Sequence, residues 1–229
     1  MFQLENVNKI YKNKETEFKA LDNISLEIAD QEILSIIGTS GSGKTTLLNI
    51  MSTVAPLSSG RINYNGMMLD TLTQSESADL RLHKFGFVFQ KYYLLPTLNI
   101  YDNICLPLIL ADKSPKPDYI NELCEVLELT DQLKKMPTQL SGGQQQRAAI
   151  ARALIMRPEV IFADEPTGNL DPQTAEEIMN LLAEINERGT TVLVVTHNKE
   201  IVNSMKKRVV TMHEGVIVSD EKEGGYHEA

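Results

Sequence analysis

The sequence predicts an α/β fold with a mainly parallel sheet, an N-terminal antiparallel β portion and an inserted helical subdomain. Continuous apolar runs, the pattern of strands buried on both faces, recur at 33–37, 85–89, 160–163 and 190–195. Helical patterns lie between these runs, so helices are expected to cover a parallel sheet. The start of the chain alternates apolar and polar residues instead, which favours antiparallel pairing there.

The antiparallel portion is predicted in two stretches. One is residues 2–28, where Phe2, Leu4 and Val7 roughly alternate with polar residues and a second apolar stretch covers 24–28. The other is the alternating run 61–64, because Asn65-Gly66 follows it and this pair signals a type I′ hairpin turn.

A helical subdomain is predicted for residues 91–157, inserted into the α/β core. Strand-like runs are absent there, and apolar residues repeat with the period of a helix at Ile120, Leu123, Cys124 and Leu127. Residues 112–118 contain two prolines and are expected to form a connecting loop. The acidic, glycine-containing end, 220–229, is expected to be a loosely held tail.

Size and composition limit the class of protein. A chain of 229 residues, of which 42% are hydrophobic, can bury the core of one domain, so residues 1–229 are treated as a single domain. Its 31 acidic and 22 basic side chains give a net charge of −9. Because this charge repels phosphate backbones, we expect no nucleic-acid partner.

Neither a disulfide framework nor a membrane-spanning segment is indicated. Cys105 and Cys124 lie in apolar segments without metal-ligand spacing, and we expect buried, reduced thiols. The apolar runs are far shorter than the roughly 18 residues that a spanning helix needs, and the first residues lack the pattern of a signal peptide. The chain is therefore expected to be cytoplasmic, with any path through a membrane supplied by other chains.

A phosphate-binding loop is predicted where the run 33–37 ends. Residues 38–45 fit the pattern G-x-x-x-x-G-K-[ST] and precede a helical run, 44–51. Glycines let backbone N–H groups surround phosphates, and the helix N-terminus adds a positive field. Lys44 is expected to pair with the β- and γ-phosphates of ATP, and Thr45 to bind Mg²⁺. The full set of binding residues predicted here is Gly38, Ser40, Gly41, Ser42, Gly43, Lys44, Thr45 and Thr46.

Two carboxylates, Asp164 and Glu165, follow the run 160–163 at the sheet edge where ligands bind in open α/β folds. Adjacent carboxylates after a strand are more often a solvated strand end. With the phosphate-binding loop present, Asp164 is expected to hold Mg²⁺ and Glu165 to accept the proton of an attacking water.

Residues 140–147 read Leu-Ser-Gly-Gly-Gln-Gln-Gln-Arg, a string that resembles the signature motif of the ABC ATPase family. Ser141, Gly142, Gly143 and Gln144 are expected at the start of a helix over 144–157, where exposed backbone donors form a second anion site. In that family, this site serves the ATP bound to the other subunit. The resemblance therefore implies a P-loop ATPase core, ATP with Mg²⁺, and a homodimer across two ATP molecules.

Two further positions resemble the catalytic residues of the family. Gln90 resembles the Q-loop glutamine, which senses Mg²⁺ and the attacking water. His197, at the end of the run 190–196, resembles the switch histidine that contacts the γ-phosphate. A lone histidine after a strand is usually a surface or core residue, so this assignment depends on the other motifs.

Tyr11 and Asp171 complete the resemblance. Tyr11 resembles the aromatic residue that stacks on adenine, although a tyrosine between two early strands commonly only packs. Asp171 closes the segment 169–171, which resembles the D-loop. One departure is Gln31, where the family usually has glycine; the turn there must form without a positive φ or with strain.

Within the family, residues 86–90, 94–96 and 164–171 look most like the MacB/LolD/FtsE branch. Residues 103–108 resemble the exporters of that branch, whereas 196–203 and 224–226 resemble FtsE. The resemblance favours an ATPase of the MacB/LolD type. Such a subunit, peripheral on the inner face of the cell membrane, drives export or extraction of a peptide, drug or lipoprotein through a separate permease. An FtsE-like cell-division ATPase is the alternative.

A docking surface is implied at residues 91–96, which resemble the region that receives a coupling helix of the permease. The alternative is that Tyr92 and Tyr93 only pack the helical subdomain.

Two other classes of protein fit less well. A soluble ABC ATPase acting on nucleic acid or ribosomes usually carries coiled coils or a second ATPase domain, and a P-loop kinase or GTPase has no signature motif; residues 198–201 also fail the guanine-reading pattern.

Overall fold

The structure, a computed structural model, describes residues 1–12 and 16–224. Its strands are β1 (Phe2–Lys12), β2 (Glu17–Ile28), β3 (Ile33–Gly38), β4 (Ser59–Tyr64), β5 (Met67–Met68), β6 (Phe85–Phe89), β7 (Val160–Asp164), β8 (Thr191–Val195), β9 (Arg208–His213) and β10 (Val216–Glu221). Its helices are α1 (Lys44–Met51), α2 (Gln74–Lys84), α3 (Ile100–Leu110), α4 (Pro117–Val126), α5 (Gly142–Leu154), α6 (Pro172–Glu187) and α7 (Lys199–Met205). Short 3-10 helices are η1 (Leu69–Thr71), η2 (Thr130–Gln132) and η3 (Pro137–Gln139).

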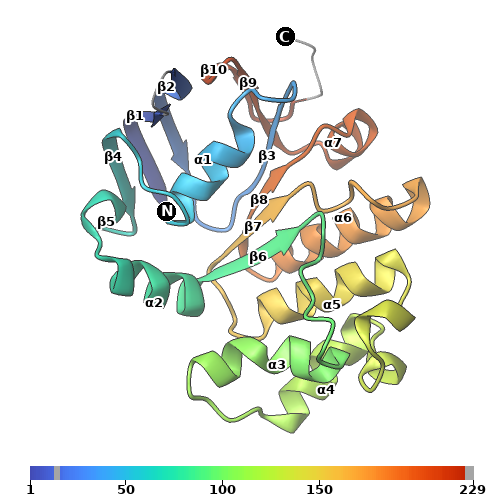
Figure 1. Cartoon of the computed structure of the whole chain (residues 1–229). Coiled ribbons are helices and arrows are strands. Elements are labelled where there is room, and N and C mark those ends of the chain that lie inside the picture. The colour runs from blue at the N-terminus through green and yellow to red at the C-terminus, as the bar shows by residue number, and fades with distance from the viewer. Residues whose placement is uncertain (13–15, 225–229) are drawn as a thin grey trace.

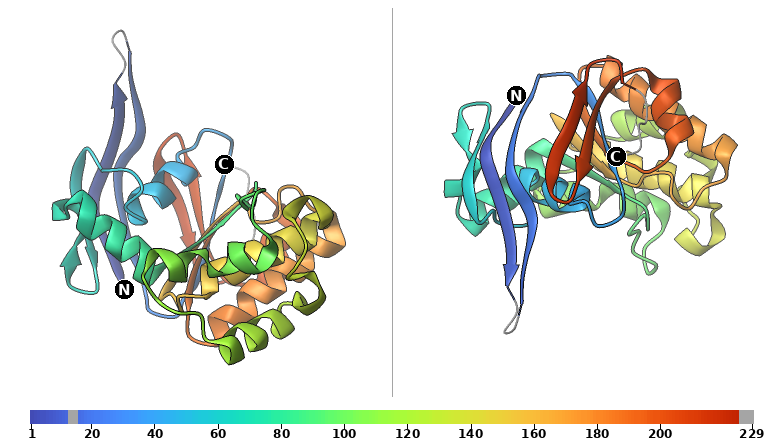
Figure 2. Two further views of the ribbon diagram at one scale, coloured as in Figure 1. Left: turned by 60° about the horizontal axis from the view of Figure 1, so that its bottom comes forward. Right: turned by 90° about the horizontal axis from the view of Figure 1, so that it is seen from above.

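Two sheets confirm the predicted α/β class. The larger sheet has the order β10-β9-β3-β8-β7-β6, in which all neighbours are parallel except the edge pair β10 and β9. The smaller sheet, β2-β1-β4-β5, is antiparallel, as predicted for the N-terminal portion. Figure 1 shows the smaller sheet beside α1, and Figure 2 shows β1 and β2 extending beyond the rest of the molecule.

Both faces of the larger sheet are buried, which explains the continuous apolar runs. On one face, Leu34, Phe162 and Leu193 share a hydrophobic core with α1 and the smaller sheet. Their neighbours along the strands point to the other face, where Ile161 and Val194 belong to a second core together with α3, α4, α5 and α6. Helices therefore cover one face, and α1 with the antiparallel sheet covers the other.

Two predicted turns have the backbone that their residues require. Asn65 and Gly66 join β4 to β5 with φ angles of 49° and 85°, which confirms the predicted hairpin. Gln31 adopts φ 60°, so of the two alternatives for this turn the strained one is correct. The strained residue is anchored because its N–H donates to Thr191 Oγ1 at 2.9 Å and its carbonyl accepts from Asn186 Nδ2 at 2.9 Å.

Residues 91–157, all described by the structure, form α3, α4, α5, η2 and η3. The periodic residues Ile120, Leu123, Cys124 and Leu127 are buried along α4, and the two cysteines are buried free thiols, as expected. The predicted loop 112–118 is shorter, because α4 begins at Pro117, a residue suited to the first helical turn. The division of the chain into a core and an inserted helical subdomain remains a prediction.

Two boundaries differ from the sequence prediction. Helix α5 starts at Gly142, not 144, because Ser141 caps it, and it stops at Leu154, before Arg157 adopts φ 53° ahead of a proline. The predicted tail starts too early, because Asp220 lies in β10 and both of its carboxylate oxygens accept from Arg208 at 2.7 Å. Residues 225–229 lie outside the described part of the chain.

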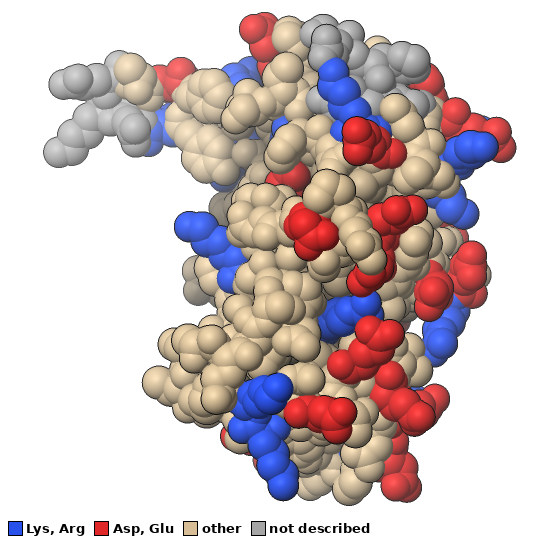
Figure 3. Space-filling model, turned by 90° about the vertical axis from the view of Figure 1, so that its right-hand side faces the viewer, with Lys and Arg blue, Asp and Glu red and all other residues tan. Residues whose placement is uncertain are grey.

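The surface carries many acidic side chains, in keeping with the net charge of −9. On the face drawn in Figure 3, they gather over the half farther from the β1–β2 projection. Within residues 1–12 and 16–224, no helix is both long and apolar enough to cross a membrane.

Asn103 holds the loop between β6 and α3 through hydrogen bonds, and we predict that its loss destabilises the fold. Its fully buried side chain accepts from Leu95 N at 2.7 Å and donates to the carbonyls of Leu95, Leu98 and Asn99, each at 3.0 Å. We expect Asn103→Leu to lower the free energy of unfolding by about 2 kcal/mol, because part-buried backbone groups of the loop lose four hydrogen bonds to this side chain. Urea titration measures the loss, with Asn121→Leu, at an exposed residue on α4, as the control. Equal urea midpoints for Asn103→Leu and the control would contradict the prediction.

Candidate nucleotide-binding and hydrolysis site

The loop between β3 and α1 has the backbone of a phosphate cradle. Gly38, Gly41 and Gly43 have φ angles of 145°, 80° and 100°, which residues with a Cβ rarely adopt. A Cβ on Gly38 would also lie 2.1 Å from the carbonyl oxygen of Met212 in β9. The sequence therefore needs glycine at this position both for conformation and for space.

The β9–β10 hairpin supports this loop from the side. The N–H of Gly215 donates to the Ser42 carbonyl at 3.1 Å, and the Gly215 carbonyl accepts from Asp22 N at 2.8 Å. This hairpin was not predicted from the sequence. Its turn, Glu214-Gly215 with φ angles of 46° and 82°, carries a glycine signal that could have revealed it.

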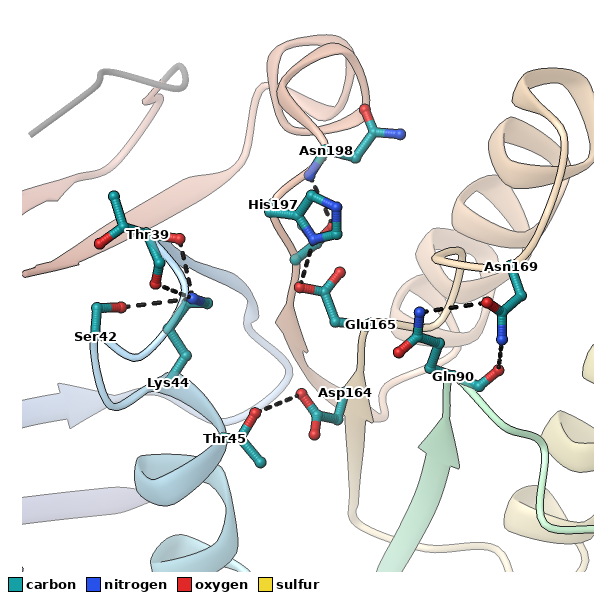
Figure 4. A network of polar contacts seen from close by, with 12 residues as sticks. Thr39, Ser42, Lys44, Thr45, Gln90, Asp164, Glu165, Asn169, His197 and Asn198 are labelled. Atoms are coloured by element: carbon teal, nitrogen blue, oxygen red, sulfur yellow. Dashed lines mark hydrogen bonds and ion pairs between the residues drawn. The ribbon is translucent and has the colours of Figure 1, made fainter. Parts of the chain in front are cut away.

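Lys44 lies at the start of α1 with its ammonium inside the loop. Its Nζ donates to the carbonyls of Gly38 at 2.9 Å and Thr39 at 2.8 Å, and lies 3.5 Å from Ser42 Oγ (Figure 4). Burial lowers the pKa of Lys44, whereas the nearby carboxylates of Glu165 and Asp164 raise it. A cation held among backbone carbonyls can exchange them for phosphate oxygens of similar hydrogen-bonding character.

Thr45 and Asp164 bring a hydroxyl and a carboxylate together after the loop. Thr45 Oγ1 donates to Asp164 Oδ1 at 3.1 Å. These two residues line one hollow with Gln90 and Glu165. No group of three or more His, Cys, Asp or Glu side chains in the described part of the chain could hold a metal. One carboxylate and one hydroxyl are oxygen donors of the kind that would hold Mg²⁺.

Glu165 and His197 are paired across the ends of β7 and β8. His197 Nδ1 lies 2.8 Å from Glu165 Oε1, and the N–H of Glu165 donates to the Val195 carbonyl at 2.8 Å. Glu165 has φ 50°, a strained conformation that directs its side chain into the hollow. The carboxylate is thus held in one position beside Asp164 and Thr45, as a general base requires.

Gln90 follows β6 and is held by an asparagine from the D-loop segment. Its N–H donates to the Asp164 carbonyl at 3.0 Å, and its own carbonyl accepts from Asn169 Nδ2 at 2.9 Å. Gln90 Nε2 also lies 3.4 Å from Asn169 Oδ1 (Figure 4). Sequence reasoning missed this role of Asn169, because the two residues are far apart along the chain.

The signature segment, residues 140–147, forms the capped N-terminus of α5. Ser141 Oγ accepts from Gln144 N at 3.3 Å, and Gln144 Oε1 accepts from Ser141 N at 3.0 Å, which makes a capping box. A Cβ on Gly143 would lie 2.6 Å from Thr174 Cγ2. In Figure 1, α5, which begins with the signature segment, lies away from α1, which follows the phosphate-binding loop.

Asp171 and Tyr11 do not line the hollow that Thr45, Asp164 and Glu165 share. Asp171 caps α6, where its carboxylate accepts from Thr174 N at 3.1 Å and Oγ1 at 2.6 Å; these bonds lower the pKa of Asp171. Tyr11 lies on β1, 45% exposed, with the Lys9 ammonium 5.0 Å from the centre of its ring. Its stacking on adenine stays a prediction, as do the roles of the other site residues.

Comparison with known proteins identifies the family. The family model of the ABC transporter matches residues 21–168, which contain the phosphate-binding loop, Gln90, the signature segment and both carboxylates. The chain belongs to the ABC transporter family.

Relatives of this ABC ATPase have two kinds of architecture. The cell-division ATP-binding protein FtsE of Bacillus subtilis is 42% identical over 99% of this chain and 98% of its own length. The macrolide export ATP-binding/permease protein MacB of Pasteurella multocida is 41% identical over 96% of this chain. The chain spans about a third of the length of that MacB relative, 34%.

Solved structures confirm the fold and the enzyme class. The bacterial ABC transporter cassette MJ0796, solved as a dimer, has a TM-score of 0.89 and 39% identity, covering 99% of this chain and all of its own. The same cassette in a post-hydrolysis state with ADP and Pi has a TM-score of 0.88. The chain is therefore a nucleotide-binding ATPase of the ABC type.

Asp164 provides a prediction about pH. Burial raises the pKa of Asp164 above its ordinary value of 3.8; the Thr45 hydrogen bond and the Lys44 charge oppose the rise, and the Glu165 carboxylate adds to it. Because the pKa is raised in the folded state, ionised Asp164 destabilises the fold. The free energy of unfolding therefore falls as the pH rises from the ordinary pKa through the raised one. In urea titrations without Mg²⁺ or nucleotide, Asp164→Asn should be more stable than the wild-type ATPase at pH 7, and the difference should shrink at low pH. A less stable variant at pH 7 would contradict this.

Proposed function

We propose that the chain is the ATP-hydrolysing subunit of a membrane complex and works as a homodimer that closes around two ATP-Mg²⁺ molecules. The observation that carries the proposal is that α1, which begins at Lys44 after the glycine-rich loop, and α5, which Ser141 caps, lie apart in one chain (Figure 1). A two-fold dimer would bring the Ser141 of one copy to the loop of the other. That the related cassette MJ0796 was solved as a dimer supports this arrangement.

Each half-site would then divide the chemistry among its residues. Lys44 and the loop N–H groups would bind the phosphates, and Thr45 and Asp164, with Gln90 nearby, would hold Mg²⁺. The ion would neutralise charge on the phosphate oxygens. Glu165, oriented by His197, would accept the proton of the attacking water. Loss of the bridging γ-phosphate would weaken the contact between the two copies.

A separate membrane subunit would dock in an apolar groove beside β6. The groove has a volume of about 450 Å³ and is lined by apolar side chains of α3 and β6, among them Phe87, Leu106 and Pro107. Val54, Tyr93 and Leu110 line it too and are exposed by 54%, 60% and 68%. An exposed apolar groove of this kind suits a helix from a partner protein. The chain would thus lie on the inner face of the membrane.

We propose export or extraction of a peptide, drug or lipoprotein, as in the MacB/LolD type, as the work of this complex. The matched part of MacB belongs to a protein named for both ATP binding and a permease, which supports a permease as partner. A second candidate is FtsE-like work in cell division. It is favoured by the FtsE relative, which this chain matches over nearly the whole length of both.

Association with a membrane subunit tests the proposal. The tagged ATPase would be purified in detergent from membranes of its own cells, and the membrane protein that co-purifies with it identified. Leu110→Asp should abolish co-purification and leave basal ATP hydrolysis unchanged, whereas Val126→Asp, at a residue 42% exposed on α4, should change neither. An intact complex with Leu110→Asp would refute the docking groove, and the identity of the membrane protein decides between export and cell division.

A further inference from the structure

The backbone directly after Gln90 is held in an unfavourable conformation. Tyr92 and Tyr93 have φ angles of 58° and 47°, so two consecutive bulky residues lie in the left-handed region. Such residues persist only where their surroundings fix them. Something must therefore hold this segment in place.

Arg152, on the last turn of α5, supplies that restraint. Its Nη2 donates to the Tyr92 carbonyl at 2.6 Å and its Nη1 to the Tyr93 carbonyl at 2.5 Å. One planar guanidinium thus binds two successive carbonyls, a geometry that the single ammonium of lysine cannot reproduce. The segment after Gln90 is thereby fixed to the helix that begins with the signature motif.

The other end of α5 contacts the same segment. A Cβ added to Gly142 would lie 3.0 Å from Tyr92 Oη and 3.2 Å from Leu170 Cδ2. The Tyr92 hydroxyl and a D-loop side chain therefore both lie against the first signature glycine. Three segments that are distant in sequence meet at Gly142, and Asn169 next to Leu170 holds Gln90.

We infer that Arg152 and Tyr92 are positioning residues that join Gln90, which serves the chain's own ATP, to the signature glycine Gly142, which serves the partner's ATP. This inference rests on the proposed dimer. With the two half-sites of one chain fixed to each other, a change at one ATP is transmitted to the other, and hydrolysis is cooperative in ATP concentration.

Arg152→Met tests the link. We expect kcat to fall about ten-fold and the Hill coefficient for ATP to fall towards one. The dissociation constant for ATP, measured on dilute monomer, should stay within two-fold of wild type, because Lys44 and its loop are untouched. Arg152→Lys should recover part of kcat, and Tyr92→Ala should lower the Hill coefficient in the same way.

Arg157→Met is the matched control. Arg157 follows α5 too, but its guanidinium lies 4.3 Å from the centre of the Tyr119 ring, away from the motifs. Wild-type kcat and Hill coefficient are expected for this variant. If Arg152→Met does not fold, Tyr92→Ala decides.

Two outcomes would overturn the inference: wild-type kcat and cooperativity in Arg152→Met and Tyr92→Ala, or a loss of kcat that parallels a loss of ATP affinity and thermal stability without recovery in Arg152→Lys. Glu165→Gln is measured beside these variants. If it keeps wild-type turnover, the proposed function fails; if it loses turnover while Arg152→Met stays normal, only this inference fails.

Discussion

Replacing Glu165 with glutamine is expected to abolish most ATP turnover, by roughly a hundred- to ten-thousand-fold, the range that a positioned general base contributes. Glutamine keeps the shape of the side chain but cannot take up the proton of the attacking water. The His197 ring, 2.8 Å from Glu165 Oε1, can still contact the amide oxygen. Phosphate release under single-turnover conditions measures the loss.

ATP binding should survive in Glu165→Gln, because Lys44, Thr45 and the loop glycines are unchanged. With hydrolysis blocked, the bridging γ-phosphates remain and the dimer should accumulate, which light scattering would detect as a doubled mass with ATP and Mg²⁺ but not with EDTA. Glu176→Gln, an exposed residue on α6, serves as the control and should behave like wild type. Undiminished phosphate release from Glu165→Gln would refute the role of general base.

The sequence predicts best the features that depend on neighbouring residues. Apolar runs located β3, β6, β7 and β8 because these strands are buried on both faces. The glycine pattern located the loop at 38–45 because backbone geometry there depends on residue type. The capping residue Ser141 was placed at the start of a helix for the same reason. The error of two residues at the helix start arose because glycines disfavour helix yet are tolerated in a first turn that a serine caps.

Contacts between distant segments were beyond sequence reasoning. Asn169 bonds to Gln90 across 79 positions, and Arg152 reaches Tyr92 across 60. Each arginine or asparagine of the chain is equally plausible for such a role until the fold is known. Of the overlooked β9–β10 hairpin, β10 has a weak pattern because it is an edge strand in which no residue is buried, whereas β9 is mostly buried.

A negative charge introduced at Ser141 is expected to have the second large effect on ATP turnover. Ser141→Asp keeps the helix cap, since aspartate caps helices as well as serine does and suits the helix N-terminus. In the proposed dimer, its carboxylate would face the phosphates of the partner's ATP. Two like charges about 4 Å apart at an effective dielectric constant of about 20 repel by about 4 kcal/mol, which is roughly a thousand-fold in dimer formation and turnover.

Ser141→Asn separates charge from shape, because asparagine matches aspartate in size, caps the helix equally well and carries no charge. It should keep most of the activity that Ser141→Asp loses. Mixing Ser141→Asp with Lys44→Met then tests the shared site directly. In the mixed dimer, the intact loop of the first variant meets the intact signature segment of the second, so one composite site is complete and ATP binding at the interface should reappear. Equal activity of the Asp and Asn variants, or a mixture no better than its parts, would show that Ser141 does not act on a partner's nucleotide.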